Sequence, residues 1–383
     1  MDYYCSTKFK ELLVNVQSRS IYNCCKAHPE RVNIEWLEAN PGKLFHTDTM
    51  INDRRAMIAN KSCASCYYGC YKYEERGETS ARQLNKNKNK DKIVDVYAPL
   101  MELQISLTSD CNLSCVYCSP EWSTAWHRDI EKNGDYILEG QVLKNNNWSK
   151  LWSNMKQKSR GTGSKFFSLL LREIKLANQL KKITLLGGEP LLNNQFDKLI
   201  DVIDELKINV VTGLGVTDER LGKILQKIQR KNVMFEISAE ATGKFFEFIR
   251  HGLEWKDFQK RVCMIENKKH SIGFSSTISN LSVFDFHNFY EQYGKKFPIN
   301  LNTIAGRPFL SPHVLDEKSK EQSYKKFSKL GSHADKLLKM IEPNPTDIDR
   351  YNLGKYLKLL SDRRLIRLDF LPKHLRDWCA SDT

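Results

Sequence analysis

The stretch CNLSCVYC, residues 111–118, carries three cysteines in a C-x3-C-x2-C spacing. It comes shortly after MELQISLT, residues 101–108, whose alternating apolar positions predict a strand. A closed structural zinc site takes four ligands and a disulfide joins two thiols, so three thiols on one loop is an unusual number. The spacing therefore indicates a metal centre that keeps one coordination position open, next to the end of a strand.

Two kinds of metal centre fit three cysteines. A zinc ion would need a fourth ligand, for which His127 is the nearest candidate, or a water molecule. An iron–sulfur cube held by Cys111, Cys115 and Cys118 would leave one iron open. That iron could chelate the amino and carboxylate groups of S-adenosylmethionine (SAM), and electron transfer would then generate a carbon radical. We favour the cube, because the open iron explains why a fourth cysteine is missing.

The composition fits a protein with a substantial core and a basic surface. The chain has 383 residues, 40% of them hydrophobic, and a formal net charge of +14. This charge permits contact with nucleic acid or another acidic partner, and it equally fits a solvated lysine-rich surface. No stretch resembles a signal peptide or a membrane span, so we expect a cytoplasmic protein without membrane contact. Eleven cysteines in a reducing compartment then indicate metal binding or redox chemistry.

Strands and helices alternate after the polar run NKNKNKDK, residues 85–92, which we interpret as a solvated linker. We predict strands at 101–108, 182–186, 208–213, 232–238, 271–279 and 299–305, and helices at 165–180, 196–207 and 218–231. Only helical periodicity remains beyond residue 316. This order predicts an α/β fold with a parallel sheet or a partial barrel.

The cysteine loop resembles that of the radical SAM superfamily, including the aromatic Tyr117 before its last cysteine. A second element supports the resemblance: the strand at 182–186 leads into Gly187-Gly188-Glu189-Pro190, which matches the superfamily's GGEP motif. The glycines allow close backbone approach. The resemblance implies that Glu189 accepts a hydrogen bond from the SAM ammonium, and that Gly187, Gly188 and Pro190 belong to the cofactor site.

Further positions resemble the superfamily's SAM contacts. Ser238 and Glu240 stand at the end of the predicted strand 232–238, where relatives contact the ribose and carboxylate of SAM, often with Asp in place of Glu240. The stretch FIRHG, residues 248–252, followed by Trp255 is similar to an element of one radical SAM subgroup. The resemblance implies that Arg250 pairs with the SAM carboxylate as a charge-assisted fork.

A second group of cysteines precedes the linker. Cys63-x2-Cys66 and the charged stretch after it are similar to the auxiliary-cluster region of twitch/SPASM-type radical SAM proteins. The resemblance implies a second, auxiliary 4Fe–4S cluster; zinc and redox-active or structural thiols remain the alternatives. We choose its ligands as Cys5, Cys24, Cys63 and Cys66, with Cys25 and Cys70 in reserve.

The chain is thus predicted to hold three parts. They are a cysteine-rich auxiliary-cluster domain with its linker at 1–92, a partial (β/α)6 TIM-like barrel radical SAM core at 93–315, and a helical C-terminal extension at 316–383. The core contains an insertion at about 120–163. Four tryptophans stand in this insertion, which we expect to pack as a small subdomain rather than to form a lid over the site: Trp122, Trp126, Trp148 and Trp152.

The predicted function is that of a radical SAM enzyme. A 4Fe–4S cluster at the loop would reduce SAM to a 5′-deoxyadenosyl radical, which abstracts hydrogen from a substrate; the reaction that follows is not specified. We expect a peptide or protein side chain, with a nucleotide or nucleic-acid base or a small molecule as alternatives, and an electron donor such as flavodoxin or ferredoxin. A non-enzymatic iron–sulfur electron carrier or regulator is the alternative of another class. The catalytic residues are unknown from the sequence.

Overall fold

The computed structural model describes residues 2–86, 92–143, 164–203, 205–304, 306–341 and 346–380. The chain divides into two compact units that interleave along the sequence. Unit 1 comprises Met1–Thr108, Trp152–Val210 and Arg230–Val233. Unit 2 comprises Ser109–Leu151, Val211–Gln229 and Met234–Thr383. Most of the predicted linker, residues 87–91, lies outside the described residues.

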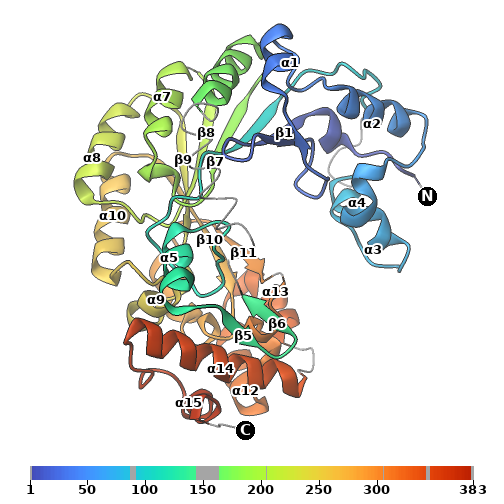
Figure 1. Ribbon diagram of the computed structural model, residues 1–383. Helices are drawn as coiled ribbons and strands as arrows, with labels where there is room; N and C mark the ends of the chain where they lie inside the picture. The colour runs from blue at the N-terminus through green and yellow to red at the C-terminus, as the bar shows by residue number, and fades with distance from the viewer. Residues whose placement is uncertain are drawn as a thin grey trace. The chain divides into compact units, whose positions relative to one another are not determined.

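The strands of unit 1 follow the order β3-β2-β1-β4-β7-β8. The first three pair antiparallel, whereas β1 with β4, β4 with β7 and β7 with β8 pair in parallel. Figure 1 shows α7 alongside β7 and β8. The strands are β1 Glu11–Asn15, β2 Ser20–Tyr22, β3 Glu30–Arg31, β4 Glu102–Ser106, β7 Lys182–Leu186 and β8 Lys207–Thr212, of which the last two residues fall in unit 2.

The helices of unit 1 are short in its N-terminal part and longer around the parallel strands. They begin after side-chain caps such as Asn33, Thr47 and Asn193, each of which accepts a hydrogen bond from a backbone N–H of the first turn. The elements are η1 Ser6–Phe9, α1 Ile34–Ala39, α2 Asp48–Ile58, η2 Ala64–Cys66, η3 Tyr67–Tyr71, α3 Lys72–Glu74, α4 Ala81–Lys86, a helix at 164–176, η4 Pro190–Leu192 and α7 Asn194–Val202.

Unit 2 continues the strand–helix alternation. Its strands β9, β10 and β11 are parallel and adjacent in that order. They are β9 Val233–Ser238, β10 Ser271–Ile278 and β11 Ile299–Thr303, and a separate hairpin is formed by β5 Tyr136–Leu138 and β6 Gln141–Leu143. The helices are α5 Thr124–Asn133, α8 Asp218–Lys227, α9 Gly243–Ile249, α10 Trp255–Asn267, η5 Ser282–Phe284, α11 Phe286–Tyr293, η6 Pro308–Leu310, η7 Pro312–Val314, α12 Glu317–Phe327, η8 Gly331–His333, α13 Ala334–Ile341, α14 Asp347–Arg364 and α15 Lys373–Ala380.

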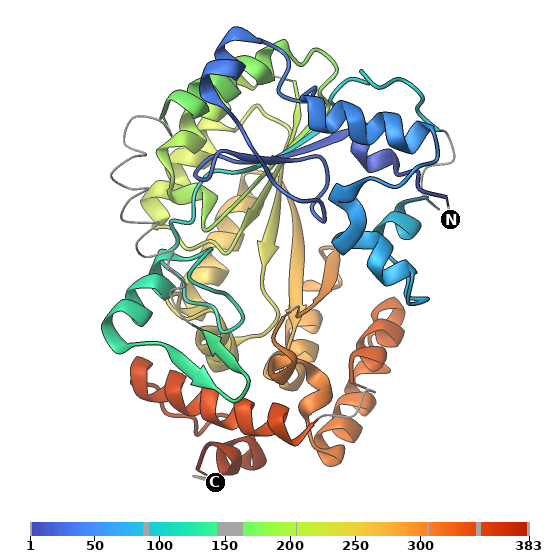
Figure 2. The same ribbon diagram turned by 45° about the vertical axis from the view of Figure 1, so that its right-hand side comes forward.

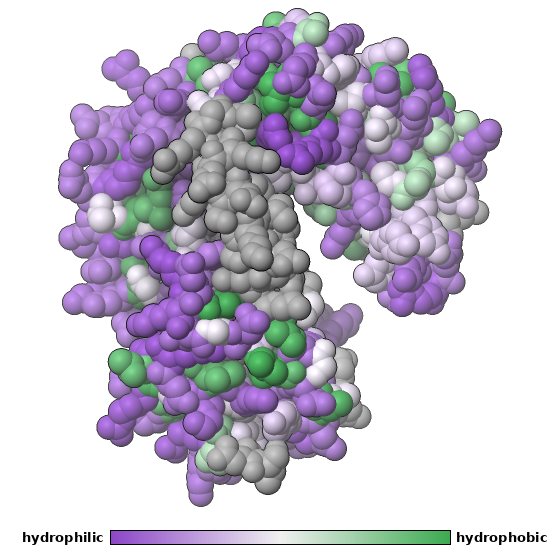
Figure 3. All heavy atoms as spheres, viewed as in Figure 1, coloured by the Kyte–Doolittle hydropathy of each residue, from purple (hydrophilic) through white to green (hydrophobic). Residues whose placement is uncertain are grey.

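The helices beside these strands are amphipathic. In α8, Leu221, Ile224 and Leu225 are buried, whereas Lys223 and Glu219 form an exposed ion pair one turn apart. Figure 3 shows that hydrophilic residues predominate where α8 and α10 face the viewer. The apolar stripe of each helix covers the strands, and the charged stripe meets water.

The described part of the predicted insertion packs against the C-terminal helix α14. Trp126 and Tyr136 are buried, and both rings contact the ring of Tyr356 in α14. Figure 2 shows the hairpin beside α14, where the side chain of Asn352 donates to the carbonyl of Glu139 over 2.9 Å. Residues 144–163, with Trp148 and Trp152, lie outside the described residues.

The α/β prediction is confirmed, with two differences in detail. The predicted helix 196–207 ends at Val202, because Ile203 is extended and Glu205 has a positive φ of 59°. Strand β1 was not predicted, yet it adds the N-terminal segment to the sheet beside β4. Within the described residues, no helix combines the length and the apolar character that crossing a membrane requires.

Candidate functional site

The cysteine loop of unit 2 is fixed by backbone hydrogen bonds to the segment after α9. The Ser114 amide donates to the His251 carbonyl over 2.9 Å and the Val116 amide donates to the Ile249 carbonyl over 2.8 Å. Within the loop, the Cys118 amide donates to the Cys115 carbonyl over 2.9 Å. The loop backbone therefore has a defined path although it forms no helix or strand.

A glycine and a tryptophan complete this support. Gly252 has φ +109°, and a Cβ there would lie only 2.8 Å from the carbonyl oxygen of Asn112, so the close approach requires glycine. On the other side, the indole Nε1 of Trp126 donates to the Cys115 carbonyl over 2.8 Å. The three cysteines are therefore carried by a loop that is packed on both sides.

The structure brings together three of the predicted SAM-site residues. The Arg250 guanidinium forms a fork with Glu240, with Nε to Oε1 at 3.1 Å and Nη2 to Oε2 at 2.7 Å. The Tyr117 hydroxyl donates to Glu240 Oε1 over 2.9 Å. Glu240 is fully buried and Arg250 is 7% exposed. The buried charges of Glu240 and Arg250 therefore pair with each other. The contact of these residues with SAM remains a prediction.

Three arginines from distant parts of the chain surround the loop. Arg250 Nη1 lies 3.7 Å from Cys115 Sγ. Arg364 Nη2 donates to the Ser114 carbonyl over 2.6 Å, and Arg307 Nη1 donates to the Val116 carbonyl over 3.2 Å. Only Arg250 has a carboxylate partner among the described residues, so the loop lies in a region of excess positive charge.

This positive charge bears on the ionisation of the thiols. Burial raises the pKa of Cys115, and burial together with Cys115 raises that of Cys118 to about 12, although Arg307 and Arg250 act in the opposite direction. Metal ligation needs the thiolate form. Three thiols on one loop, next to buried guanidinium groups that favour their anions, fit the donor set of a thiolate-ligated iron–sulfur cluster.

The GGEP element lies in unit 1, directly after β7. Gly187 has φ +137°, and a Cβ there would lie 2.4 Å from the carbonyl oxygen of Thr108, which also accepts the Gly188 amide over 2.7 Å. Glu189 is fully buried and caps η4 by accepting the Leu191 amide over 3.2 Å. The requirement for glycine at position 187 is thus explained by its contact with Thr108, which follows β4 in the chain.

Ser238, the remaining predicted SAM contact, is the last residue of β9. It pairs in register with Ser275 of β10. Glu240 follows two residues later, so both side chains stand at the carboxyl ends of parallel strands, where α/β proteins bind ligands.

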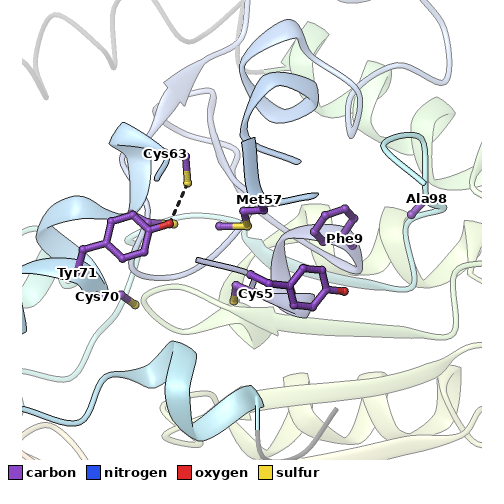
Figure 4. Packing of buried hydrophobic residues seen from close by; sticks show 9 residues of the cluster. Cys5, Phe9, Met57, Cys63, Cys70, Tyr71 and Ala98 are labelled. Atoms are coloured by element: carbon purple, nitrogen blue, oxygen red, sulfur yellow. Dashed lines mark hydrogen bonds between the residues drawn. The ribbon is translucent and has the colours of Figure 1, made fainter. Parts of the chain in front are cut away.

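The N-terminal cysteines of unit 1 gather in a hydrophobic cluster (Figure 4). Cys5, Cys63, Cys66 and Cys70 are each 4–6% exposed. The Cys63 sulfur lies 3.5 Å from the hydroxyl of Tyr71. Cys24 is half-buried and is close enough to Cys5 and Cys70 to raise the pKa of each, after the larger effect of burial, whereas Cys25 is exposed. Three of the four predicted ligands, Cys5, Cys63 and Cys66, thus lie in one cluster with Cys70, whereas Cys24 is not among its members.

A buried ion pair lies against these thiols. Lys8 is fully buried, and its Nζ donates to Asp53 Oδ2 over 2.7 Å and to Ser65 Oγ over 2.6 Å. Burial alone would lower the pKa of Lys8, but Cys66 and Asp53 raise it above its ordinary value. A hydrogen bond from Cys66 lowers the pKa of Cys63 to about 6. Clustered thiols beside a buried ammonium fit a thiolate-bound metal centre.

No three His, Cys, Asp or Glu side chains in the described part form a ready-made site for a metal ion. Both ligand sets therefore stay predictions that rest on their thiols. No sequence pattern singles out Arg364 or the Lys8–Asp53 pair in this lysine-rich chain. Arg307 follows the predicted strand 299–305, and this position is the signal that could have identified it.

Comparison with known proteins gives distant relatives. No family model matches the chain. It is 27% identical over 214 residues to the GTP 3′,8-cyclase of Clostridium acetobutylicum, covering 54% of this chain and 56% of the relative. It is 27% identical over 237 residues to the probable GTP 3′,8-cyclase of Methanococcus aeolicus, covering 59% and 64%. The chain thus spans less than two thirds of the length of these relatives.

Among solved structures, the chain is similar to native anSMEcpe with bound AdoMet, at 14% identity and a TM-score of 0.39, covering 60% of this chain and 59% of that one. It is also similar to Streptococcus suis SuiB bound to S-adenosylmethionine, at 11% identity and a TM-score of 0.35, covering 88% and 75%. TM-scores this low do not establish a shared fold.

Proposed function

We propose that this chain, a member of the radical SAM superfamily, cleaves S-adenosylmethionine reductively at a 4Fe–4S cluster held by Cys111, Cys115 and Cys118. The observation that carries the proposal is the loop itself, with three thiols in one fixed backbone and buried arginines around it. When bound, such a cluster supplies the electron that cleaves SAM, and the resulting 5′-deoxyadenosyl radical abstracts hydrogen from a substrate.

The chain's own residues would orient and shield this site. The Glu240–Arg250 fork fixes Arg250 so that Nη1 faces Cys115, and Tyr117 is held on the same carboxylate. Arg364 ties the loop to α9 by donating to the carbonyls of Ser114 and Phe248. Glu240 is fully buried, and Arg250 and Cys115 are each 7% exposed, so water has little access to them and the electrostatic contacts there are strengthened.

The N-terminal cysteines are proposed to hold an auxiliary 4Fe–4S cluster through Cys5, Cys24, Cys63 and Cys66. Three of these residues, Cys5, Cys63 and Cys66, lie in one buried cluster, which supports this assignment, and Lys8 supplies a positive charge for the thiolates. Cys70 is buried as deeply as the chosen ligands and is the reserve ligand. An external donor such as flavodoxin or ferredoxin would supply electrons.

Two substrate classes remain in the proposal. The names of the sequence relatives, GTP 3′,8-cyclase, favour a nucleotide such as GTP. A basic chain with net charge +14 is compatible with phosphate-bearing ligands. We therefore place the nucleotide first, and the peptide or protein side chain expected from the sequence becomes the second candidate.

The test is anaerobic reconstitution of the full chain with iron and sulfide. We expect about seven to eight irons per chain and, with dithionite, formation of 5′-deoxyadenosine from SAM. A protein that takes up zinc instead and does not cleave SAM would contradict the proposal. An iron-loaded protein that never binds SAM in calorimetry would support the electron-carrier alternative.

The substrate class is tested separately. Deuterium transfer from labelled GTP, or from a peptide library, into 5′-deoxyadenosine identifies the hydrogen donor directly. A filter-binding titration against RNA and DNA serves as the control for polymers, because nucleic-acid affinity should fall steeply with salt.

A further inference from the structure

The three arginines at the cysteine loop differ in how many of their donors are used. Arg250 uses Nε and Nη2 on Glu240 and Nη1 on Cys115. Arg364 uses Nη1 on the Phe248 carbonyl and Nη2 on the Ser114 carbonyl. Arg307 makes one hydrogen bond, from Nη1 to the Val116 carbonyl. A guanidinium carries five N–H donors, so Arg307 retains most of its hydrogen-bonding capacity.

Within the described residues, Arg307 is also a buried charge without an acidic partner. It is 7% exposed, and none of the carboxylates in the described residues forms an ion pair with it. Removing an arginine from water without an anion is costly, and the cost is offset when an anion is bound. Such a residue on a protein surface would need no explanation, but one buried beside a candidate active site does.

The position of Arg307 is that of a ligand contact. It follows β11 by a short loop and precedes η6, so it stands at the carboxyl ends of the parallel strands β9–β11 of unit 2. Ligands of open α/β sheets bind at this edge. Its Nη1 donates to the Val116 carbonyl over 3.2 Å, so an anion bound by Arg307 would lie at the cysteine loop.

We propose that Arg307 binds an oxyanion, a carboxylate or a phosphate, of a ligand held at the cysteine loop. The proposal deepens the proposed function and rests on it for the identity of the ligand. Two ligands carry suitable groups: SAM has a carboxylate, and a nucleotide substrate has phosphates. Arg250, for which the sequence predicts the contact with the SAM carboxylate, already has its charge paired with Glu240.

The experiment compares ligand pairs that differ in the anion alone. Equilibrium binding is measured for SAM against decarboxylated SAM, and for GTP against guanosine, on the reconstituted full chain. Wild type, Arg307→Met and Arg307→Lys are compared with Arg363→Met, which removes a half-buried guanidinium of α14 whose Nη1 and Nη2 donate to the carbonyls of Gly134 and Asp135 and not to the cysteine loop. Iron content of each protein is determined in parallel.

We expect wild type to prefer the anionic member of one pair, and Arg307→Met to reduce that preference by about 10- to 100-fold, the value of a hydrogen-bonded charge. Arg307→Lys should keep part of the preference, because an ammonium retains the charge but not the fork. Arg363→Met should leave the preference unchanged, because Arg363 donates to carbonyls outside the loop. The pair that responds identifies the source of the oxyanion.

Other results overturn the proposal. If wild type and Arg307→Met preferred the anionic ligands to the same extent, within about twofold in affinity ratio, Arg307 would contact neither ligand. Loss of iron in both Arg307 variants but not in Arg363→Met would show that Arg307 acts on the loop instead. The GTP and guanosine pair can also be measured without iron, so a failure of the cluster chemistry is distinguishable from a failure of this inference.

Discussion

The two cysteine-bearing regions use opposite means to hold their thiols. In unit 2, three cysteines come from one eight-residue loop, and backbone hydrogen bonds with three arginines fix it. In unit 1, the cysteines come from separate segments that meet in a hydrophobic cluster with Phe9, Met57 and Tyr71 (Figure 4). The first site depends on local backbone geometry, and the second depends on tertiary packing.

The electrostatic surroundings differ in the same way. Beside the N-terminal cysteines, the buried charge of Lys8 is matched by that of Asp53. Around the loop, Glu240 is the only carboxylate among the described residues that pairs with any of the three guanidinium groups. The excess of positive charge at the loop suits a centre that also receives an anionic ligand. The comparison yields four predictions, in order of decreasing effect.

The first prediction concerns the loop. Cys115→Ser removes one of three thiolates, so no other loop cysteine can replace it, and 5′-deoxyadenosine formation should be abolished. Cys263→Ser is the matched control, because Cys263 is exposed and far from both sets in sequence. If Cys115→Ser cleaved SAM at a rate comparable to that of Cys263→Ser, Cys115 would not be a ligand of the proposed cluster.

The second prediction concerns the N-terminal set. The double variant Cys63→Ser/Cys66→Ser should lose about half of the bound iron but keep the loop cluster and its ability to bind SAM. Iron analysis with Mössbauer or electron paramagnetic resonance spectra measures this. Loss of all iron would mean that the two regions do not form independent centres.

The third prediction compares the two buried ion pairs. Arg250→Met leaves Glu240 as an uncompensated buried charge, and Lys8→Met does the same to Asp53. Each should lower the free energy of unfolding by about 3–5 kcal/mol in urea denaturation. The double variants Arg250→Met/Glu240→Gln and Lys8→Met/Asp53→Asn should recover part of this loss. If the single variants lowered the free energy of unfolding by less than about 1 kcal/mol, these buried pairs would contribute no more than exposed ion pairs do.

The fourth prediction is a pH dependence of stability to which His46 of unit 1 contributes. Burial, and then Arg54, lowers the pKa of His46 to about 4. Its Nδ1 lies 3.2 Å from Arg54 Nη1, and Arg54 Nε also holds the Lys8 carbonyl over 3.0 Å. Neutral His46 is therefore favoured in the folded state. The stability it contributes is complete above pH 6.5 and is lost as the pH falls towards 4.

The size of this effect is about 1–2 kcal/mol once the partial exposure of His46 is allowed for. Urea denaturation at pH 7 and pH 5 measures it, with His46→Gln as the control whose stability should change less between the two pH values. An equal acid response in both proteins would show that another group dominates.

The sequence predicted the parts of this molecule whose signals are local. The six parallel strands of the core follow from alternating or continuous apolar runs, and the cysteine loop follows from its spacing. The sequence motifs identify both Glu240 and Arg250, but they predict a separate contact of each residue with SAM. Their mutual pairing depends on how α9 returns to the end of β9, and no local pattern encodes that.

The remaining features depend on contacts between distant segments. Arg307 and Arg364 look like any other basic residue in a chain with sixty of them. Lys8 resembles a surface lysine until α2 and Ser65 enclose it. The short stretch ELLVN of β1 is too brief to identify as a strand without its partner, and that partner lies on the far side of the linker.

The parallel pairing of β1 with β4 has a consequence for how the chain reaches its native state. Glu11 pairs in register with Glu102, so β1 is synthesised long before the strand beside which it belongs. Pairing across such a separation is slow, because the loop must close before the contacts form. A chain trimmed at the linker would leave β4 as an open sheet edge, which is prone to aggregation. The N-terminal segment thus protects the barrel strands as well as carrying cysteines.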